Sequence, residues 1–421
     1  MNAAAIHIVG LGVSEKAELS SMAQAAIENA EVVIGSERQL ATLGFNENPC
    51  SYVLPKLAQL KLDLAEMLSA GKNVALLATG DPLFYGIGGW LTKRFSDAVL
   101  TFYPAVSSIQ AACHRIGISL QDTDVVSLHG RPLSSIRRHL EPGATLVILT
   151  DHKSNPVALA NECKAAKFAD SDIIVCETLG YKTEKVTCFN VEKLLTMDAQ
   201  QFDPLHLSIV KVKGAGGVLP VFPGFLDTLF VTGAAPGKGM ISKREVRLQI
   251  LSYMQPNHGD LIWDIGAGCG GVAVELAYWG QRSTVYAIEF HQERLQHLAT
   301  NREKFGVTSN LHIIKGRAPD CLVELPKPNK VFIGGSDGEL EQLLEQAWNL
   351  LPENGCLVAS AVIEQTKNQL KRFAETLAAH QVESVELAVK RGELVEAALQ
   401  YQTKLPVEIF KFIKVGDIHA R

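Results

Sequence analysis

The chain has 421 residues, more than one hydrophobic core usually serves, so its length predicts two or three domains. Hydrophobic residues make up 47% and charged residues 20% of the chain, which is typical of globular proteins and excludes a disordered or fibrous one. The net charge is -5 and neither half is strongly basic, so we expect no nucleic-acid partner.

The N-terminal segment and the cysteines indicate a cytoplasmic protein. The segment MNAAAIHIVGLG lacks the basic start of a signal peptide, and no uncharged apolar run approaches the roughly 20 residues of a membrane helix. The eight cysteines form no C-x-x-C pair and no zinc-like cluster. We therefore expect reduced thiols, no metal site and no membrane partner.

Strand and helix patterns alternate along the first half, which predicts α/β layers with mostly parallel sheets. A further division is expected near Tyr103–Ser108. The strand-like runs are AIHIVGLG, EVVIGS, NVALLATGDP, TLVILT and SDIIVCETLG, with helices expected near Ser20–Asn29 and Leu57–Ala70.

A boundary is expected in Gly214–Met240, because ten of its 27 residues are Gly or Pro, which break helices and strands alike. We place one domain at 1–213, a linker at 214–221 and a second domain at 222–421. After the linker, helices are expected near Lys243–Met254, from Gly271 and near Gln292–Phe305, between strands DLIWDIGAG, STVYAIEF, NLHIIKG, KVFIGGS and GCLVASAV. Near the end, VESVELAVKR and EIFKFIKV predict an antiparallel hairpin that closes an otherwise parallel sheet.

The strongest motif is Trp263–Gly270, read as WDIGAGCG between a strand and a helix. Its alternating glycines let the backbone approach a ligand, and the helix start offers free N–H groups. Glu289 ends the next strand, where a carboxylate can accept hydrogen bonds from ribose hydroxyls. Gly271 also satisfies a dinucleotide pattern, so the spacing does not exclude a dehydrogenase. Asp264 favours a donor with a cationic sulfonium and amino group over a pyrophosphate.

The second half resembles the decarboxylating cobalt-precorrin-6B (carbon 15) methyltransferase family over residues 222–421. The resemblance rests on GMISKREVR at Gly239–Arg247, and on DIGAGCGGVAVE, YAIE, GRAPD and VFIGGS. It implies a class I Rossmann-like methyltransferase fold with a mostly parallel seven-stranded sheet. It also implies that S-adenosylmethionine is held by Asp264, Gly266, Gly268 and Glu289, with Gly316–Pro319, including Arg317 and Ala318, beside the adenine.

Four positions depart from that family's pattern. The family usually has threonine at Ser242, serine at Cys269 and at Gly271, and aspartate at Asn329. Ser242 keeps a hydroxyl and Cys269 is nearly isosteric with serine, so donor binding is expected to survive.

The first half resembles the tetrapyrrole methylase superfamily, in its precorrin carbon-5 branch, over about residues 5–213. The matching motifs are VGLG at Val9–Gly12, ATGDPLFYG at Ala78–Gly86 and YPAVSS at Tyr103–Ser108. This implies two α/β subdomains with a second S-adenosylmethionine in the cleft between them, one donor site per domain. The predicted donor residues are Gly10, Gly12, Gly80, Asp81, Ser107 and Ser108.

Together the halves resemble, in order, the fused precorrin-6Y methyltransferases (decarboxylating) of cobalamin biosynthesis. The resemblance implies methylation of a precorrin-6-type tetrapyrrole at ring carbons 5 and 15 and decarboxylation of the acetate on carbon 12. Such a substrate carries many carboxylates, so basic residues are expected at its sites. Lys243 and Arg247, one helical turn apart, and Arg131 are the substrate-binding candidates; Lys238 and Arg244 more often form a solvated face. His129 is a weak candidate for proton transfer, and no catalytic residue is assigned.

Two alternatives stay open. The C-terminal half belongs to a fold that also serves RNA and small metabolites, although GRAPD and FIGGS argue against those substrates. The N-terminal half is either an active methyltransferase or a module that only binds or channels the tetrapyrrole. By resemblance the first half dimerises and the second tetramerises, so we expect a homo-oligomer.

Overall fold

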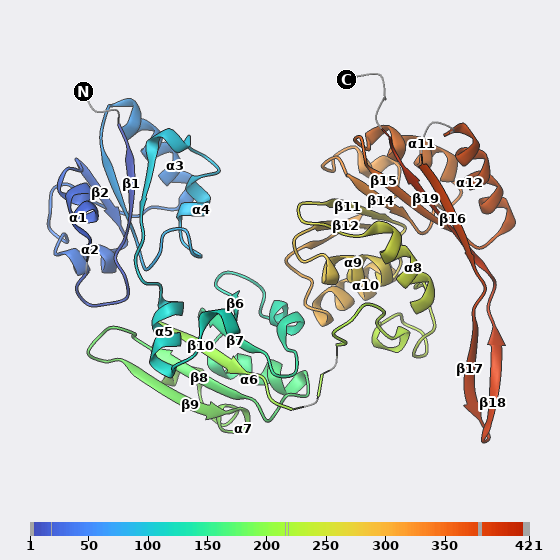
Figure 1. The fold of residues 1–421 in the computed structure, drawn as a ribbon, viewed down its shortest axis with the longest axis horizontal. Coiled ribbons are helices and arrows are strands. Elements are labelled where there is room, and N and C mark those ends of the chain that lie inside the picture. The colour runs from blue at the N-terminus through green and yellow to red at the C-terminus, as the bar shows by residue number, and fades with distance from the viewer. Residues whose placement is uncertain (1–3, 18, 215, 218, 378–380, 416–421) are drawn as a thin grey trace. The chain divides into compact units, whose positions relative to one another are not determined.

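The computed structural model describes residues 4–17, 19–214, 216–217, 219–377 and 381–415. It divides into two compact units (Figure 1). The first unit comprises the chain up to Leu133 and His139–Gly216, and the second comprises Ser134–Arg138 and the chain from Gly217 onward. Residues 215 and 218 of the expected linker lie outside the described residues.

The first unit begins with a five-stranded, entirely parallel sheet in the order β3-β2-β4-β1-β5. All five residues of β4 are buried, as expected for a central strand with helices on both faces. The strands are β1 (Ile6–Gly10), β2 (Val32–Gly35), β3 (Ser51–Val53), β4 (Val74–Ala78) and β5 (Leu100–Tyr103), with helices α1 (Ser21–Glu28), α2 (Glu37–Leu43), α3 (Leu57–Ser69) and α4 (Gly88–Leu91).

A second five-stranded sheet follows, in the order β6-β7-β10-β8-β9. Only β6 and β7 pair in parallel in this sheet, so the expectation of mostly parallel sheets is wrong here. The short connection between β8 and β9 forms a hairpin in place of a helical crossover, and β10 lies between β7 and β8 and runs opposite to both. The elements are β6 (Asp124–Ser127), β7 (Thr145–Leu149), β8 (Asp172–Glu177), β9 (Lys185–Asn190), β10 (His206–Lys211), α5 (Ser108–Ile116), α6 (Pro156–Ala165) and α7 (Val191–Leu194).

The second unit is built on a seven-stranded sheet in the order β13-β12-β11-β14-β15-β19-β16. Its first five strands are parallel, and β19 pairs antiparallel with β15 and β16, which confirms the mostly parallel sheet and the closing antiparallel pair. The strands are β11 (Leu261–Ile265), β12 (Thr284–Glu289), β13 (Leu311–Lys315), β14 (Lys330–Ile333), β15 (Cys356–Ala361), β16 (Gln381–Leu387) and β19 (Val407–Ile413).

Helices cover both faces of this sheet and bury two apolar cores. Alternation along β11 sends Ile262 into the core under α8, α9 and α10, and Trp263 into the core under α11 and α12. Among the described residues, no helix has the length and apolar character required to cross a membrane. The helices are α8 (Arg244–Met254), α9 (Gly271–Trp279), α10 (Gln292–Lys304), α11 (Leu340–Leu350) and α12 (Glu364–Thr376).

A hairpin not predicted from the sequence lies between β16 and β19. Its strands β17 (Lys390–Val395) and β18 (Ala398–Thr403) pair only with each other and extend as a ribbon beyond the large sheet (Figure 1). Several of its apolar side chains are exposed, including Leu394, Leu399 and Tyr401. We call this hairpin the arm.

Candidate functional site

A cavity of about 590 Å³ lies in the second unit, at the carboxyl ends of its parallel strands. This edge is where open α/β sheets bind ligands, close to the point where the strand order reverses between β11 and β14. The lining includes seven residues predicted from the sequence: Lys243, Asp264, Gly266, Gly268, Glu289, Arg317 and Ala318.

The glycine-rich loop between β11 and α9 forms one wall of this cavity. Gly266 and Gly268 have φ angles of 73° and 59°, a region that favours glycine. A Cβ on Gly266 would lie 2.5 Å from the carbonyl oxygen of Gly335, and one on Gly268 would lie 2.6 Å from that of Met240. The loop therefore needs glycine for its conformation and to let neighbouring segments approach.

Asp264 is a buried carboxylate at the cavity wall. It is 1% exposed, and neither of its oxygens has a hydrogen-bond partner in the structure. Burial raises the pKa of Asp264 to about 7; the backbone N–H of Ala273 opposes the rise without reaching hydrogen-bond geometry, and the charge of Glu289 adds to it. A cationic ligand group would satisfy this carboxylate.

Glu289 ends β12 and is held by backbone amides. Its Oε2 accepts a hydrogen bond from Gly268 N at 2.9 Å, and its Oε1 accepts from Phe290 N at 2.8 Å and His291 N at 2.9 Å. The carboxylate is 3% exposed and lines the cavity, so it is fixed in one orientation. Its remaining lone pairs suit hydroxyl donors.

Arg317 lies at the rim of the cavity. Its Nη2 is 2.9 Å from Asp337 Oδ2, and its guanidinium lies 5.8 Å from the centre of the Phe290 ring. Phe290 also lines the cavity and was not predicted as a site residue. Its position directly after Glu289, at the end of a strand, was the signal that could have found it.

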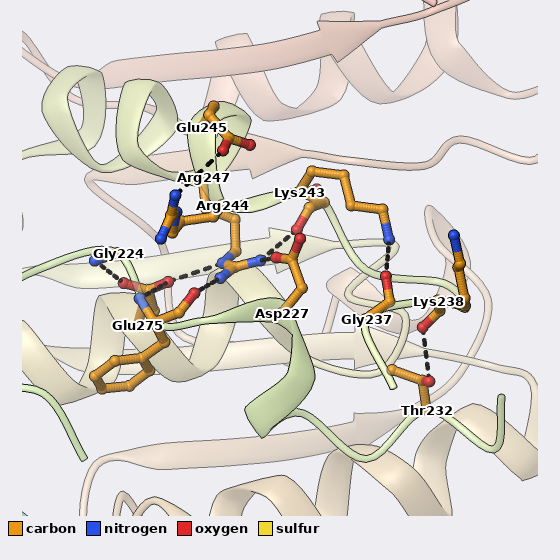
Figure 2. A network of polar contacts seen from close by, with 12 residues as sticks. Gly224, Asp227, Thr232, Gly237, Lys238, Lys243, Arg244, Glu245, Arg247 and Glu275 are labelled. Carbon is orange, nitrogen blue, oxygen red and sulfur yellow. Dashed lines mark hydrogen bonds and ion pairs between the residues drawn. The ribbon is translucent and has the colours of Figure 1, made fainter. Parts of the chain in front are cut away.

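The side chains of the two basic candidates, Lys243 and Arg247, have different partners (Figure 2). Lys243 caps the start of α8 and lines the cavity, and its Nζ donates to Gly237 O at 2.7 Å. Burial lowers the pKa of Lys243. Arg247 does not line the cavity and is 0% exposed.

Arg247 belongs to a buried ion network (Figure 2). Its Nε lies 2.8 Å from Glu275 Oε1, its Nη1 lies 2.7 Å from Asp227 Oδ1, and its Nη2 donates to Phe225 O. The prediction that Arg247 binds substrate is therefore corrected, because its guanidinium is buried and committed to these partners. Glu275, a lone charge in the apolar helix GVAVELAYW, was the available signal for this network.

The network also reaches the arm. Arg391 of β17 lies 2.7 Å from the second oxygen of Asp227 and 2.5 Å from Glu245 of α8. Burial alone would raise the pKa of the Asp227 carboxyl, but hydrogen bonds from Arg247 and Arg391 outweigh it and hold the pKa below its usual value. Asp227 thereby joins the arm to the helix and loop beside the cavity.

A second cavity, of about 560 Å³, lies in the first unit. It is lined by the predicted residues Gly12, Ser107, Ser108 and Arg131, and by His129. Tyr85, which was not predicted, also lines it and donates from its hydroxyl to Val125 O at 3.0 Å, so it connects the segment after β4 with β6. Two arginines are among the described residues that line this cavity. Arg131 follows His129 by two residues, and Arg38 lies on α2.

Three predicted donor residues do not line the second cavity but shape its walls. A Cβ on Gly10 would lie 2.3 Å from Gly80 O, and one on Gly80 would lie 2.8 Å from the Cα of Ser107. Asp81 Oδ1 accepts from the backbone N–H groups of Leu83 and Phe84 and fixes their loop. Ser107 lines the cavity and also caps α5, where its Oγ accepts from Gln110 N.

The four residues that depart from the pattern of the carbon-15 methyltransferase family lie in different parts of the second unit. Ser242 and Gly271 line the larger cavity, whereas Cys269 is buried beside it. A Cβ on Gly271 would lie 3.3 Å from Arg247 Cδ, so glycine relieves crowding around the buried arginine. Asn329 lies at the start of β14, away from the cavity, where its Oδ1 accepts from Leu261 N and its amide donates to Asp260.

Family matches in both halves place the chain among the methyltransferase enzymes. The family of tetrapyrrole (corrin/porphyrin) methylases matches residues 5–195, and the precorrin methyltransferase domain family matches residues 236–414.

Relatives cover both halves together. A precorrin-6Y C(5,15)-methyltransferase [decarboxylating] of Sinorhizobium sp is 35% identical over 369 residues, which span 85% of this chain and 84% of that protein. One from Mycobacterium tuberculosis (strain ATCC 25618 / H37Rv) is 30% identical over 87% of this chain and 89% of its own length. A probable cobalt-precorrin-6B C(15)-methyltransferase (decarboxylating) of Pyrobaculum calidifontis is 38% identical over 37% of this chain and 76% of that protein. The chain belongs to the precorrin-6Y C(5,15)-methyltransferase (decarboxylating) family, which confirms the predicted resemblance.

Proposed function

We propose that this chain methylates a precorrin-6-type tetrapyrrole at carbons 5 and 15, removes carbon dioxide from the acetate on carbon 12, and so acts in cobalamin biosynthesis. The observation that carries the proposal is the presence of two separate cavities, one in each unit, within a chain that belongs to this family. Residues 1–213 are assigned to carbon 5 and residues 222–421 to carbon 15, with 214–221 as the linker.

One S-adenosylmethionine is assigned to each cavity. In the second unit, Asp264 and Glu289 would hold its ammonium and ribose groups, with Gly266 and Gly268 beneath it and Arg317 and Ala318 beside the adenine. The unpartnered, buried carboxylate of Asp264 fits a cationic ligand, which supports this assignment. In the first unit, Gly12, Ser107 and Ser108 would contact the donor, and Gly10, Gly80 and Asp81 would hold the walls in place.

The reaction requires alignment more than acid–base chemistry. When bound, S-adenosylmethionine supplies an electrophilic methyl group to an electron-rich ring carbon. The chain's residues orient the two reactants and exclude water, and such positioning can lower a barrier by up to roughly 7–11 kcal/mol. Because an iminium-like ring carbon can accept the electron pair left by carbon dioxide, no activated side-chain nucleophile is required.

Basic residues at the two cavities are assigned to the substrate carboxylates. Lys243 serves the larger cavity and Arg131 the smaller one, and both line the cavities concerned. A cation beside each donor site suits an acidic tetrapyrrole and gives no advantage to a neutral metabolite.

The assembly is assigned as a homo-oligomer in the cytoplasm. The exposed apolar side chains of the arm support self-association, because an isolated two-stranded hairpin is only marginally stable in water. The eight cysteines are free thiols in the structure, which supports a reducing compartment.

The test is the mass of the product formed by the purified chain from S-adenosylmethionine and precorrin-6B, supplied metal-free and cobalt-loaded in parallel. We expect a gain of two methyl groups with loss of carbon dioxide from one of the two forms, which also identifies the route. An unchanged mass with both forms, while calorimetry detects donor binding, would overturn the tetrapyrrole assignment.

A further inference from the structure

The larger cavity has two chemically different ends. The proposed donor residues lie at the carboxyl ends of β11 and β12 and in the loops after β11 and β13, and they present carboxylates, glycines and backbone amides. The part at the end of β15 presents Ser360 and Ala361 of the strand and Val362 and Ile363 after it instead. Since the strand order reverses between β11 and β14, these two ends lie on opposite sides of the switch point.

Exposed apolar side chains gather at this cavity. Met240 is 58%, Val362 45% and Ile363 61% exposed, and all three line it. A single exposed apolar residue needs no explanation, but several around one concave site mark a binding surface. We call these three residues the apolar rim.

The rim is held by ordered backbone. Met240 O accepts a hydrogen bond from Cys269 N at 3.1 Å, which joins this part of the rim to the glycine-rich donor loop. Val362 directly follows β15, and Ile363 occupies the cap position before α12. The backbone of these three residues is therefore tied to the elements that form the cavity.

A cation lies in the same wall. Lys243 follows Met240 by three residues, and its ammonium donates to Gly237 O (Figure 2). No carboxylate pairs with Lys243 among the residues that the structure describes. Its charge remains available for an anionic ligand at the cavity.

A carboxylated macrocycle has apolar faces and an anionic edge, which is the complement of this arrangement. We infer that Met240, Val362 and Ile363 hold one face of the tetrapyrrole beside the donor while Lys243 receives one of its edge carboxylates. This inference rests on the proposed function and assigns the rim residues as determinants of substrate binding.

The test introduces a charge into the rim of the full-length chain. Ile363→Asp should repel the substrate carboxylates and remove apolar contact, so we expect the KM for precorrin-6B, measured from carbon dioxide release, to rise at least tenfold. The Kd for S-adenosylmethionine should stay within twofold of wild type. Leu62→Asp is the matched control, because Leu62 is 63% exposed on α3 and lines neither cavity.

The outcomes separate this inference from the proposed function. If wild type releases no carbon dioxide from either form of precorrin-6B, the proposed function fails. If wild type is active and Ile363→Asp leaves the KM unchanged, the rim assignment is overturned. This holds also where light scattering shows that the variant has a different assembly mass. Should Ile363→Asp lose donor binding, Ile363→Ser replaces it, with a severalfold rise in KM expected and an unchanged KM again contradicting the inference.

Discussion

Asp264 combines a position predictable from sequence with an environment that is not. The strand–glycine-loop pattern predicts a carboxylate two residues before the first glycine, and its suitability for a cationic donor follows from charge. That both oxygens are buried without a partner depends on segments distant in sequence, such as Glu289, so only the structure reveals it.

We expect the raised pKa of Asp264 to make donor binding at the proposed second-unit site depend on pH. At pH values below about 7 this carboxyl is protonated in the free enzyme and cannot pair with the donor's ammonium. We expect the Kd of the second-unit donor site to be constant above pH 7 and to rise by up to about tenfold per pH unit below it. Calorimetry on wild type and on Asp264→Asn checks this; a wild-type Kd that is flat from pH 5 to 8 would contradict it.

The raised pKa of Asp264 also affects the stability of the ligand-free protein. Low pH weakens donor binding, whereas it favours the folded state. A carboxyl whose pKa is raised on folding stabilises the fold below its unfolded pKa, and this contribution is lost as pH rises through the folded pKa of about 7. Asp264→Asn should therefore raise the free energy of unfolding at pH 8 by roughly 2–4 kcal/mol. Urea unfolding at pH 5 and pH 8 measures the free energy of unfolding. A variant less stable than wild type at pH 8 would contradict the raised pKa of Asp264.

The sequence predicted correctly that Arg247 lies near the start of its helix. The role predicted for it, substrate binding, does not fit its buried position. Residue spacing places Lys243 and Arg247 one turn apart, yet it cannot tell which of them faces the interior. Arg247→Met should destabilise the protein by about 3–5 kcal/mol, because Asp227 and Glu275 would lose their buried partner.

Thermal or urea unfolding measures this loss. Arg372→Met is the matched control and should change stability little, because its pair with Glu341 is exposed on both sides. Equal stability of wild type and Arg247→Met would show that the buried network contributes nothing.

At the scale of elements, the strands and helices that position both cavities were predictable. Apolar runs with flanking glycines predicted the parallel strands, and capping residues such as Ser20 mark the helix starts. The β8–β9 hairpin was missed because an alternation of apolar runs does not by itself separate a crossover from a hairpin.

The arm was missed for a specific reason. Its two-residue turn is Glu396-Ala397, with φ angles of 49° and 64°, a geometry normally announced by Asn-Gly or Asp-Gly. With that signal missing, the sequence between β16 and β19 reads as irregular.

The arm is expected to make subunit contacts. Leu394 and Leu399 face each other across β17 and β18 and are 75% and 59% exposed. The double variant Leu394→Asp/Leu399→Asp should form a smaller assembly than wild type in light scattering, since charge there disfavours apolar association. Donor binding serves as the control for folding, and an assembly mass identical to wild type would contradict this role.

At the scale of the whole molecule, the Gly- and Pro-rich stretch Gly214–Met240 predicts a domain boundary, and the bounds 1–213 and 222–421 stay a prediction. Nothing in the sequence predicted that Ser134–Arg138 groups with the second unit. Arg138 there is 4% exposed and donates to Ala277 O at 2.6 Å and Tyr278 O at 3.2 Å, contacts between residues far apart in the chain.

The central claim is that each unit carries out its own methyl transfer. The most direct test compares the product masses of wild type and Asp264→Asn, each incubated with S-adenosylmethionine and precorrin-6B. We expect two added methyl groups and loss of carbon dioxide for wild type, and one added methyl group with all carboxylates retained for the variant. A doubly methylated, decarboxylated product from Asp264→Asn, or an unmodified substrate despite donor binding in the first unit, would contradict the claim.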